Sequence, residues 1–323
     1  MADVASVVVP LFGLILLGGL AGQSTVLAKN GRRVVDWLLL RLALPALLFD
    51  ILAHATPADL GNWPFFLTLT FGTYCAFAIS FTISALRHGG DIRAASIDGA
   101  IGSHGSLAYL GPAMVLFAFG PPVAVAMAVI LLLDSLLIRL LLPTLWAIGG
   151  RERPALGAVL RRIGDLLIDQ PIFPAALVGV VLSVTGAGIP TGIGQAASLL
   201  GSAAAPLGLV GLGLALATFR SDGGASPIRL SWSPAVVTKL VVHPAVVFLL
   251  LSWAGNFDPD WMFAAALLAA LPPASGIHSM ARGSTKPEPM DAAAATGTLA
   301  SLVTITLLVV LMSERLISPD PFF

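Results

Sequence analysis

Two short segments combine histidine and serine with residues that break helices. The first centres on His104, close to Ser103 and Ser106, and the second centres on His278, close to Ser275. An imidazole has an ordinary pKa of about 6.5, so each histidine can bind a carboxylate or relay a proton at ambient pH. The alternative is a neutral histidine whose ring nitrogens bind backbone carbonyls that an interrupted helix leaves free.

A carboxylate stands in the middle of an apolar stretch. Asp134 follows Ile130–Leu133 and precedes two further leucines. An ionisable residue at membrane depth costs at least about 2.5 kcal/mol to insert and is commonly functional. Arg139 is a poor local partner, because it lies about 140° around the helix from Asp134. Asp134 is therefore either an ion-coupling carboxylate or the structural partner of a cation in another helix.

Three other polar residues have simpler interpretations. Asp98 precedes the His104 segment and is expected to cap the start of that helix. Lys239 is expected to extend its ammonium group from an apolar helix to the membrane surface. Tyr109 adjoins the first break and either contacts a substrate or packs as an aromatic side chain.

The composition is that of a protein embedded in a membrane. Of 323 residues, 57% are hydrophobic and 11% are charged, and the mean hydropathy is +0.94. A soluble domain carries about 25% charged residues, so a cytosolic enzyme is excluded as the default. Lysines and arginines balance the acidic residues at 17 each, which gives no basic field for nucleic acid. Cys75 is the only cysteine, so no disulfide within the chain and no cysteine metal cage can form.

Apolar stretches long enough to cross a bilayer recur along the chain. They predict ten transmembrane helices, at 4–22, 33–54, 63–86, 94–119, 121–147, 171–188, 197–219, 234–253, 261–282 and 291–313. Most lysines and arginines fall in the connections after the odd-numbered spans, whereas the opposite side receives Arg315. Positive charge favours the cytoplasm, so both termini are expected on the non-cytoplasmic side of the cytoplasmic (inner) membrane.

Prolines recur at a constant offset between the two halves of the chain. Pro10, Pro45 and Pro112 correspond in this way to Pro171, Pro206 and Pro273. We therefore predict a first five-helix repeat at 1–150, a cytoplasmic connecting loop at 151–170 and a second repeat at 171–323. An odd number of spans in each repeat gives the two repeats opposite orientations, as in many secondary transporters.

The fourth and ninth predicted spans should not form continuous helices. Four glycines precede Pro112 in the fourth span, and Pro272 and Pro273 interrupt the ninth. A glycine costs about 1 kcal/mol and a proline about 3 kcal/mol inside a helix. Interrupted helices at membrane depth line cavities, and their free N–H groups favour anions. The predicted substrate site comprises Ser103, His104, Ser106, Tyr109, Pro112, Pro273, Ser275, Gly276 and His278, with Asp134 for ion coupling.

Three short motifs resemble the auxin efflux carrier family, whose bacterial members include malonate-transporter-like permeases. The motifs are Val9–Gly18, Leu42–Phe49 and Tyr109–Pro112. The resemblance implies an all-α membrane protein with ten helices in two inverted repeats, with the fourth and ninth helices broken and crossing. It also implies transport of small organic anions. One feature departs from the family: where members often carry asparagine before a Gly-x-Pro motif, this chain has His104 nearby, and proline directly follows Gly111.

The expected function is secondary active transport of a small organic anion by alternating access, coupled to protons or sodium ions. An anion channel or an uncoupled facilitator is the alternative. An intramembrane enzyme is disfavoured because the chain lacks His-Glu-x-x-His and Gly-x-Ser-x-Gly motifs. A sensor would need an output domain. The expected partners are the anion and the lipid bilayer but not nucleic acid, a homodimer is allowed, and no metal or other cofactor is expected.

Overall fold

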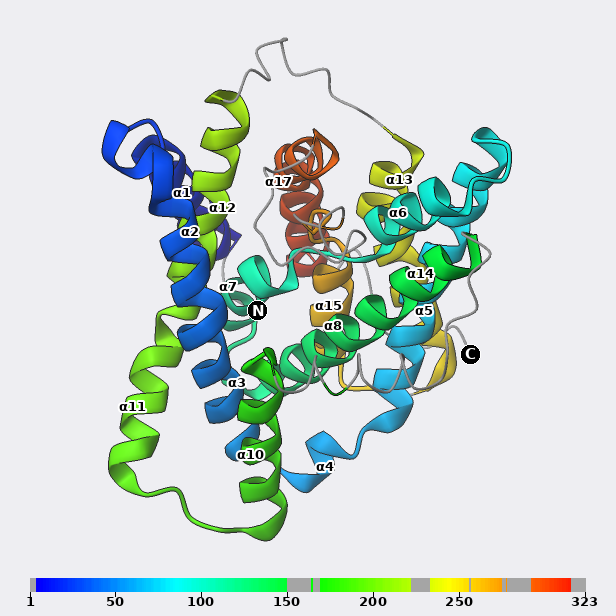
Figure 1. Cartoon of the computed structure of the whole chain (residues 1–323). Helices are drawn as coiled ribbons and strands as arrows, with labels where there is room; N and C mark the ends of the chain where they lie inside the picture. Colours follow the sequence, from blue (N-terminus) through cyan, green and yellow to red (C-terminus); the bar gives the residue numbers. More distant parts are fainter. Residues whose placement is uncertain are drawn as a thin grey trace. The chain divides into compact units, whose positions relative to one another are not determined.

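The structure is helical wherever it describes the chain. The computed structural model describes residues 4–149, 164, 169–221, 233–255, 257–274, 277 and 292–314. In these ranges the backbone forms helices and no strands, apart from an isolated antiparallel bridge between Gly105 and Pro273 (Figure 1). The predicted all-α class is confirmed.

The first part of the chain contains nine helical segments in the described range 4–149. They are α1 (Val4–Ala21), α2 (Thr25–Leu38), the π-helix η1 (Leu39–Ala43), α3 (Leu44–Ala53), α4 (Pro57–Leu60), α5 (Trp63–Arg87), α6 (Ile92–Ser103), α7 (Leu107–Ala118) and α8 (Pro121–Gly149). Pro45 lies in the first turn of α3, where a proline costs no hydrogen bond.

The described residues after position 169 form a second series of helices. They are α10 (Ile172–Thr185), α11 (Thr191–Ser202), α12 (Ala204–Ser221), α13 (Pro234–Val237), the π-helix η2 (Thr238–Val242), α14 (His243–Ala254), α15 (Pro259–Ala269) and α17 (Ala292–Ser313). Most of the predicted connecting loop, 151–170, lies outside the described residues.

Five helices are long and apolar enough to cross a membrane, as judged within the described ranges. They are Pro57–Arg87, Pro121–Gly149, Thr191–Ala217, Pro234–Ala254 and Ala293–Ser313. Shorter apolar helices occupy Val8–Ala21, Leu107–Ala118, Ile172–Thr185 and Pro259–Ala269. The chain is therefore a multi-pass helical protein by length and composition, while the count of ten spans and their inverted arrangement remain predictions.

One compact unit comprises Met1–Phe66, Ala108–Leu132 and Ile163–Ala217. Within it, α3 packs against α10 and α11. The helices α1 and α12 approach each other closely at Gly213, where a side chain would collide with the backbone carbonyl of Ile15. Small residues at such contacts are how membrane helices bring their backbones together.

The other compact unit comprises Leu67–Leu107, Leu133–Arg162 and Thr218–Phe323. Within it, η2 contacts α6 and α17, and α14 packs against α15. Its buried apolar residues include Phe77, Ala100, Ile101, Leu142, Val236, Leu240 and Ile277. Both halves of the sequence contribute to each compact unit. The compact units therefore do not coincide with the predicted repeats at 1–150 and 171–323, and these repeats remain a prediction.

Both predicted interruptions occur in the backbone. The helix α6 ends at Ser103, His104 takes an extended conformation, and α7 begins at Leu107 (Figure 1). The helix α15 ends at Ala269, just before Pro272 and Pro273. Glycines and prolines lower helix stability locally, so these positions follow from the residues themselves.

Candidate functional site

The two interrupted segments pair with each other within the second compact unit. The amide of Ser106 donates to the carbonyl of Pro272 at 2.9 Å, and the amide of Ala274 donates to the carbonyl of His104 at 3.1 Å. The Ser106 hydroxyl also donates to the carbonyl of Pro273 at 3.2 Å. We call this pairing of residues 104–106 with 272–274 the crossing. It satisfies backbone groups that the broken helices leave free, as burial in a membrane protein requires.

The crossing brings together four of the residues predicted for the site: Ser103, His104, Ser106 and Pro273. Tyr109 belongs to the first compact unit, where its hydroxyl donates to Asp36 at 3.1 Å. Pro112 lies inside α7, in the same unit. Substrate contact by Tyr109 and Pro112 therefore stays a prediction. The remaining three predicted residues, Ser275, Gly276 and His278, lie outside the described residues.

His104 is buried between a hydroxyl and a carboxylate. Its side chain is 3% exposed, its Nδ1 lies 2.6 Å from Ser103 Oγ, and its Nε2 lies 3.1 Å from Asp134 Oδ1. The Nε2 contact has the distance of an ion pair without the direction of a hydrogen bond. The ring of Tyr74 stands edge-on to the imidazole, with centroids 6.1 Å apart. The imidazole thus lies between the Ser103 hydroxyl and the Asp134 carboxylate, and it also bonds the backbone of Ala100, so the two interpretations of His104 both stay open.

Lys239 is completely buried beside the crossing. Its Nζ donates to the carbonyl of Ala269, the end of α15, at 2.6 Å and lies 2.9 Å from His243 Nδ1. A cation at the C-terminus of a helix is favoured by the helix dipole. The ammonium also interacts electrostatically with Asp134, from α8. The expectation that Lys239 extends to the membrane surface is wrong, because η2 turns its side chain into the protein against α15.

Sequence reasoning missed the residues that accompany Lys239. His243 lies four residues after the lysine and its Nε2 is 3.2 Å from Thr73 Oγ1, while Tyr74 comes from the same helix as Thr73. One signal was available, because residues four apart lie on the same face of a helix. A lysine and a histidine on one face of an apolar span are energetically costly to bury unless each has a polar partner. Thr73 and Tyr74 carry no comparable signal.

Asp98 does not cap α6, contrary to expectation. The N-cap is Asp91, whose side chain accepts hydrogen bonds from the amides of Arg93 and Ala94. Asp98 lies in the middle of α6 and accepts a hydrogen bond from the Ser84 hydroxyl at 2.6 Å. The helix begins earlier than expected because Asp91 already satisfies its first free amides.

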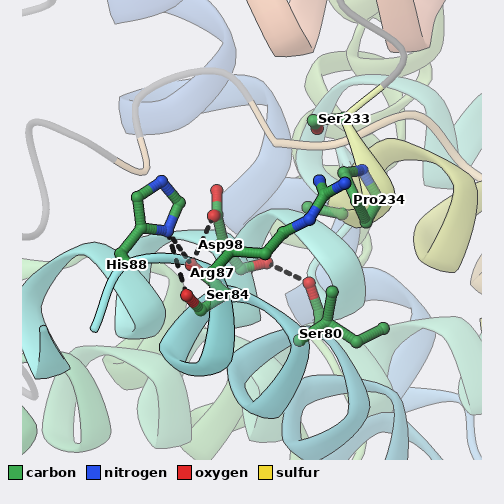
Figure 2. A pocket seen from close by; sticks show the side chains of 9 residues that line it. Ser80, Ser84, Arg87, His88, Asp98, Ser233 and Pro234 are labelled. Carbon is green, nitrogen blue, oxygen red and sulfur yellow. Dashed lines mark hydrogen bonds between the residues drawn. The ribbon is translucent and has the colours of Figure 1, made fainter. Parts of the chain in front are cut away.

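Asp98 instead lines a separate pocket on α5, α6 and α13. The pocket has a volume of about 520 Å³ and is lined by Ser80, Ile83, Ser84, Arg87, His88, Asp98, Ser233, Pro234 and Ala235. Figure 2 shows Ser84 between His88 and Asp98, with Arg87 extending toward Pro234. The basic side chains here, Arg87 and His88, are exposed, whereas the charges at the crossing are buried. We place the candidate site at the crossing, because a buried charge binds an ion far more strongly than an exposed one.

The crossing leaves no room for a side chain at Gly105. A methyl group there would lie 3.1 Å from Leu271 Cβ and 3.2 Å from Lys239 Nζ. We expect Gly105→Ala to destabilise the protein by about 1–3 kcal/mol through overpacking. Thermal unfolding in detergent measures this. Gly13→Ala is the matched control, because a methyl group at Gly13 meets nothing within 4 Å; equal melting temperatures for the two variants would contradict the packing described.

Comparison with known proteins points in one direction. A family model described as "Membrane transport protein" matches residues 151–309. A protein of Rhizobium meliloti (strain 1021), named "Putative malonate transporter", is 29% identical over 326 residues, covering 100% of both chains. Both findings agree with the resemblance carried by the three sequence motifs.

Proposed function

We propose that this chain, a membrane transporter related to the auxin efflux carrier family and not an enzyme, carries a small carboxylate anion across the cytoplasmic membrane by alternating access. The observation that supports this most is the buried ammonium of Lys239 beside the crossing. A fixed, already desolvated cation offsets the cost of removing an anion from water. Both termini are proposed to lie on the non-cytoplasmic side.

The proposed binding site combines the Lys239 ammonium with the polar groups of the crossing. Ser103, His104 and Ser106 contribute from the break after α6, and Pro273 from the break after α15. Ser275, Gly276 and His278 are proposed to complete the site from the sequence beyond Ala274. Asp134 is the proposed ion-coupling residue, because it is the carboxylate that contacts His104.

The relative's name makes malonate the first substrate to test. Its carboxylate chemistry suits a site with one fixed ammonium and several hydrogen-bond donors. An anion channel or an uncoupled facilitator would share the same helices and breaks. Saturation and exchange distinguish a carrier from a channel, because a carrier binds its substrate in each cycle.

Reconstituted protein is expected to take up labelled malonate with saturation and with acceleration by unlabelled malonate inside the vesicles. His104→Ala should reduce malonate affinity about tenfold or more, because a hydrogen bond to a charged group contributes about 1.5–3 kcal/mol. His54→Ala is the control: His54 is exposed at the end of α3 and bonds the carbonyl of Asp50. Uptake that neither saturates nor exchanges would support a channel and contradict the proposal.

A further inference from the structure

We infer that His104 and Asp134 together bind one coupling proton, and that a carboxylate reaching Lys239 is bound together with that proton. The inference rests on the proposed function, and it names the ion that drives transport. Three features of the second compact unit support it: the directions of the hydrogen bonds at His104, the hydrogen bonds at Lys239, and the charge balance of the group.

The hydrogen bonds at His104 place a proton on Nδ1. The Ser103 hydroxyl has one proton and donates it to the carbonyl of Gly99 at 2.8 Å. Its oxygen is then left to accept from His104 Nδ1, 2.6 Å away. In a neutral imidazole Nε2 would carry only a lone pair, and it lies 3.1 Å from Asp134 Oδ1. Two acceptors repel at that distance, so a second proton belongs to the pair, on the imidazole or on the carboxyl group.

The hydrogen bonds at Lys239 leave no comparable position for that proton. The ammonium donates to the carbonyl of Ala269 and to His243 Nδ1. We assign the His243 proton to Nε2, which lies 3.2 Å from Thr73 Oγ1, and the Thr73 hydroxyl donates to the carbonyl of Leu69 at 3.2 Å. In this assignment Lys239 is charged and His243 is neutral, and the carbonyl of Ala269 is shared by the two side chains. The exchangeable proton is confined to His104 and Asp134.

The charge balance couples the proton to the anion. The titratable side chains facing the pair in the described residues are Tyr74 of α5, Lys239 of η2 and His243 of α14. Tyr74 and His243 are neutral, so without the proton the carboxylate of Asp134 cancels the charge of Lys239. With the proton bound, the group carries one net positive charge and matches one of the two carboxylates of malonate. Each ligand therefore increases the affinity for the other, as linkage requires.

Asp134 is the less enclosed member of the pair. Its side chain is 17% exposed, whereas that of His104 is 3% exposed. We therefore assign the entry and exit of the proton to the carboxyl group of Asp134. The proton that is taken up with the anion leaves from Asp134 when the anion leaves Lys239, and no other reactant is needed.

Calorimetric titration of the purified protein with malonate tests the inference directly. Measured from pH 6 to pH 9 in two buffers of different ionisation enthalpy, binding in the wild type should take up no proton where the free pair already holds it, and up to about one proton per malonate at the higher pH values, where the free pair has lost it. Asp134→Asn should bind malonate with no proton uptake, because its group carries a permanent net positive charge. In proteoliposomes, Asp134→Asn should exchange malonate but fail to accumulate it against a gradient. Asp98→Asn is the control, since Asp98 lies in the separate pocket, and it should behave as wild type.

The outcomes separate this inference from the proposed function. Binding without proton uptake in the wild type at every pH in this range, or equal uptake in Asp134→Asn, would overturn the inference and leave the anion site standing. If malonate does not bind at all, the proposed function fails for this substrate. Nitrogen-15 NMR of histidine in the ligand-free protein still decides the proton site. In the wild type we expect a proton on His104 Nδ1 and a titration of the His104 imidazole that is absent from Asp134→Asn. A His104 ring that is protonated on Nε2 and does not titrate would refute the inference.

Discussion

Lys239→Met is expected to weaken malonate binding by about a hundredfold or more. Truncating one partner of a buried, hydrogen-bonded charge pair costs about 2–5 kcal/mol, and a hundredfold change corresponds to about 2.8 kcal/mol. Methionine keeps much of the length of the lysine side chain but supplies no charge to the carboxylate of a substrate. Calorimetric or fluorescence titration with malonate measures the effect.

The same substitution should destabilise the protein, and a double variant separates the two effects. Lys239→Met leaves Asp134 as an unpaired buried carboxylate, which costs about 3–5 kcal/mol of stability. Combining it with Asp134→Asn removes that charge, so the melting temperature should recover toward wild type while malonate binding stays weak. Malonate binding by the stable double variant at wild-type affinity would exclude Lys239 from the anion site.

Replacing both Pro272 and Pro273 with alanine is expected to reduce malonate exchange more than tenfold without loss of stability. Each proline disfavours a helix by about 3 kcal/mol relative to alanine, so α15 should extend beyond Ala269. In a continuous helix the carbonyl of residue 272 would no longer accept the hydrogen bond from the amide of Ser106, so the crossing would be lost. Exchange in proteoliposomes and thermal unfolding of the same preparation give the two readouts.

A proline elsewhere provides the control for this double substitution. Pro10 lies inside α1, in the other compact unit. Pro10→Ala should leave malonate exchange within about twofold of wild type while also favouring a continuous helix. If the Pro272 and Pro273 double variant exchanges malonate as fast as Pro10→Ala, the break after α15 serves packing alone.

Local sequence properties were sufficient to predict the helical class of this protein and its two interrupted segments. The low charge and long apolar stretches predicted a helical membrane protein, because residues that face lipid must be apolar along whole helices. Gly105 and the adjacent Pro272 and Pro273 lie where helices stop, since propensity depends on the residue itself. Gly99, Gly102, Gly111 and Pro112 are nevertheless accommodated inside α6 and α7. His104 and Asp134 were recognised individually because polar groups at membrane depth are costly wherever they pack.

Only the tertiary structure decided which of these groups meet. Asp134 contacts His104 from a different helix, and Lys239 reaches the carbonyl of Ala269, far along the chain. Helical periodicity gives the face of a residue on its own helix but not the distance to another helix, so Lys239 was assigned to the membrane surface. The charge partners depend on how α6, α8, η2 and α15 pack, because the burial of a charge and the position of its partner are properties of the assembled unit rather than of any one segment.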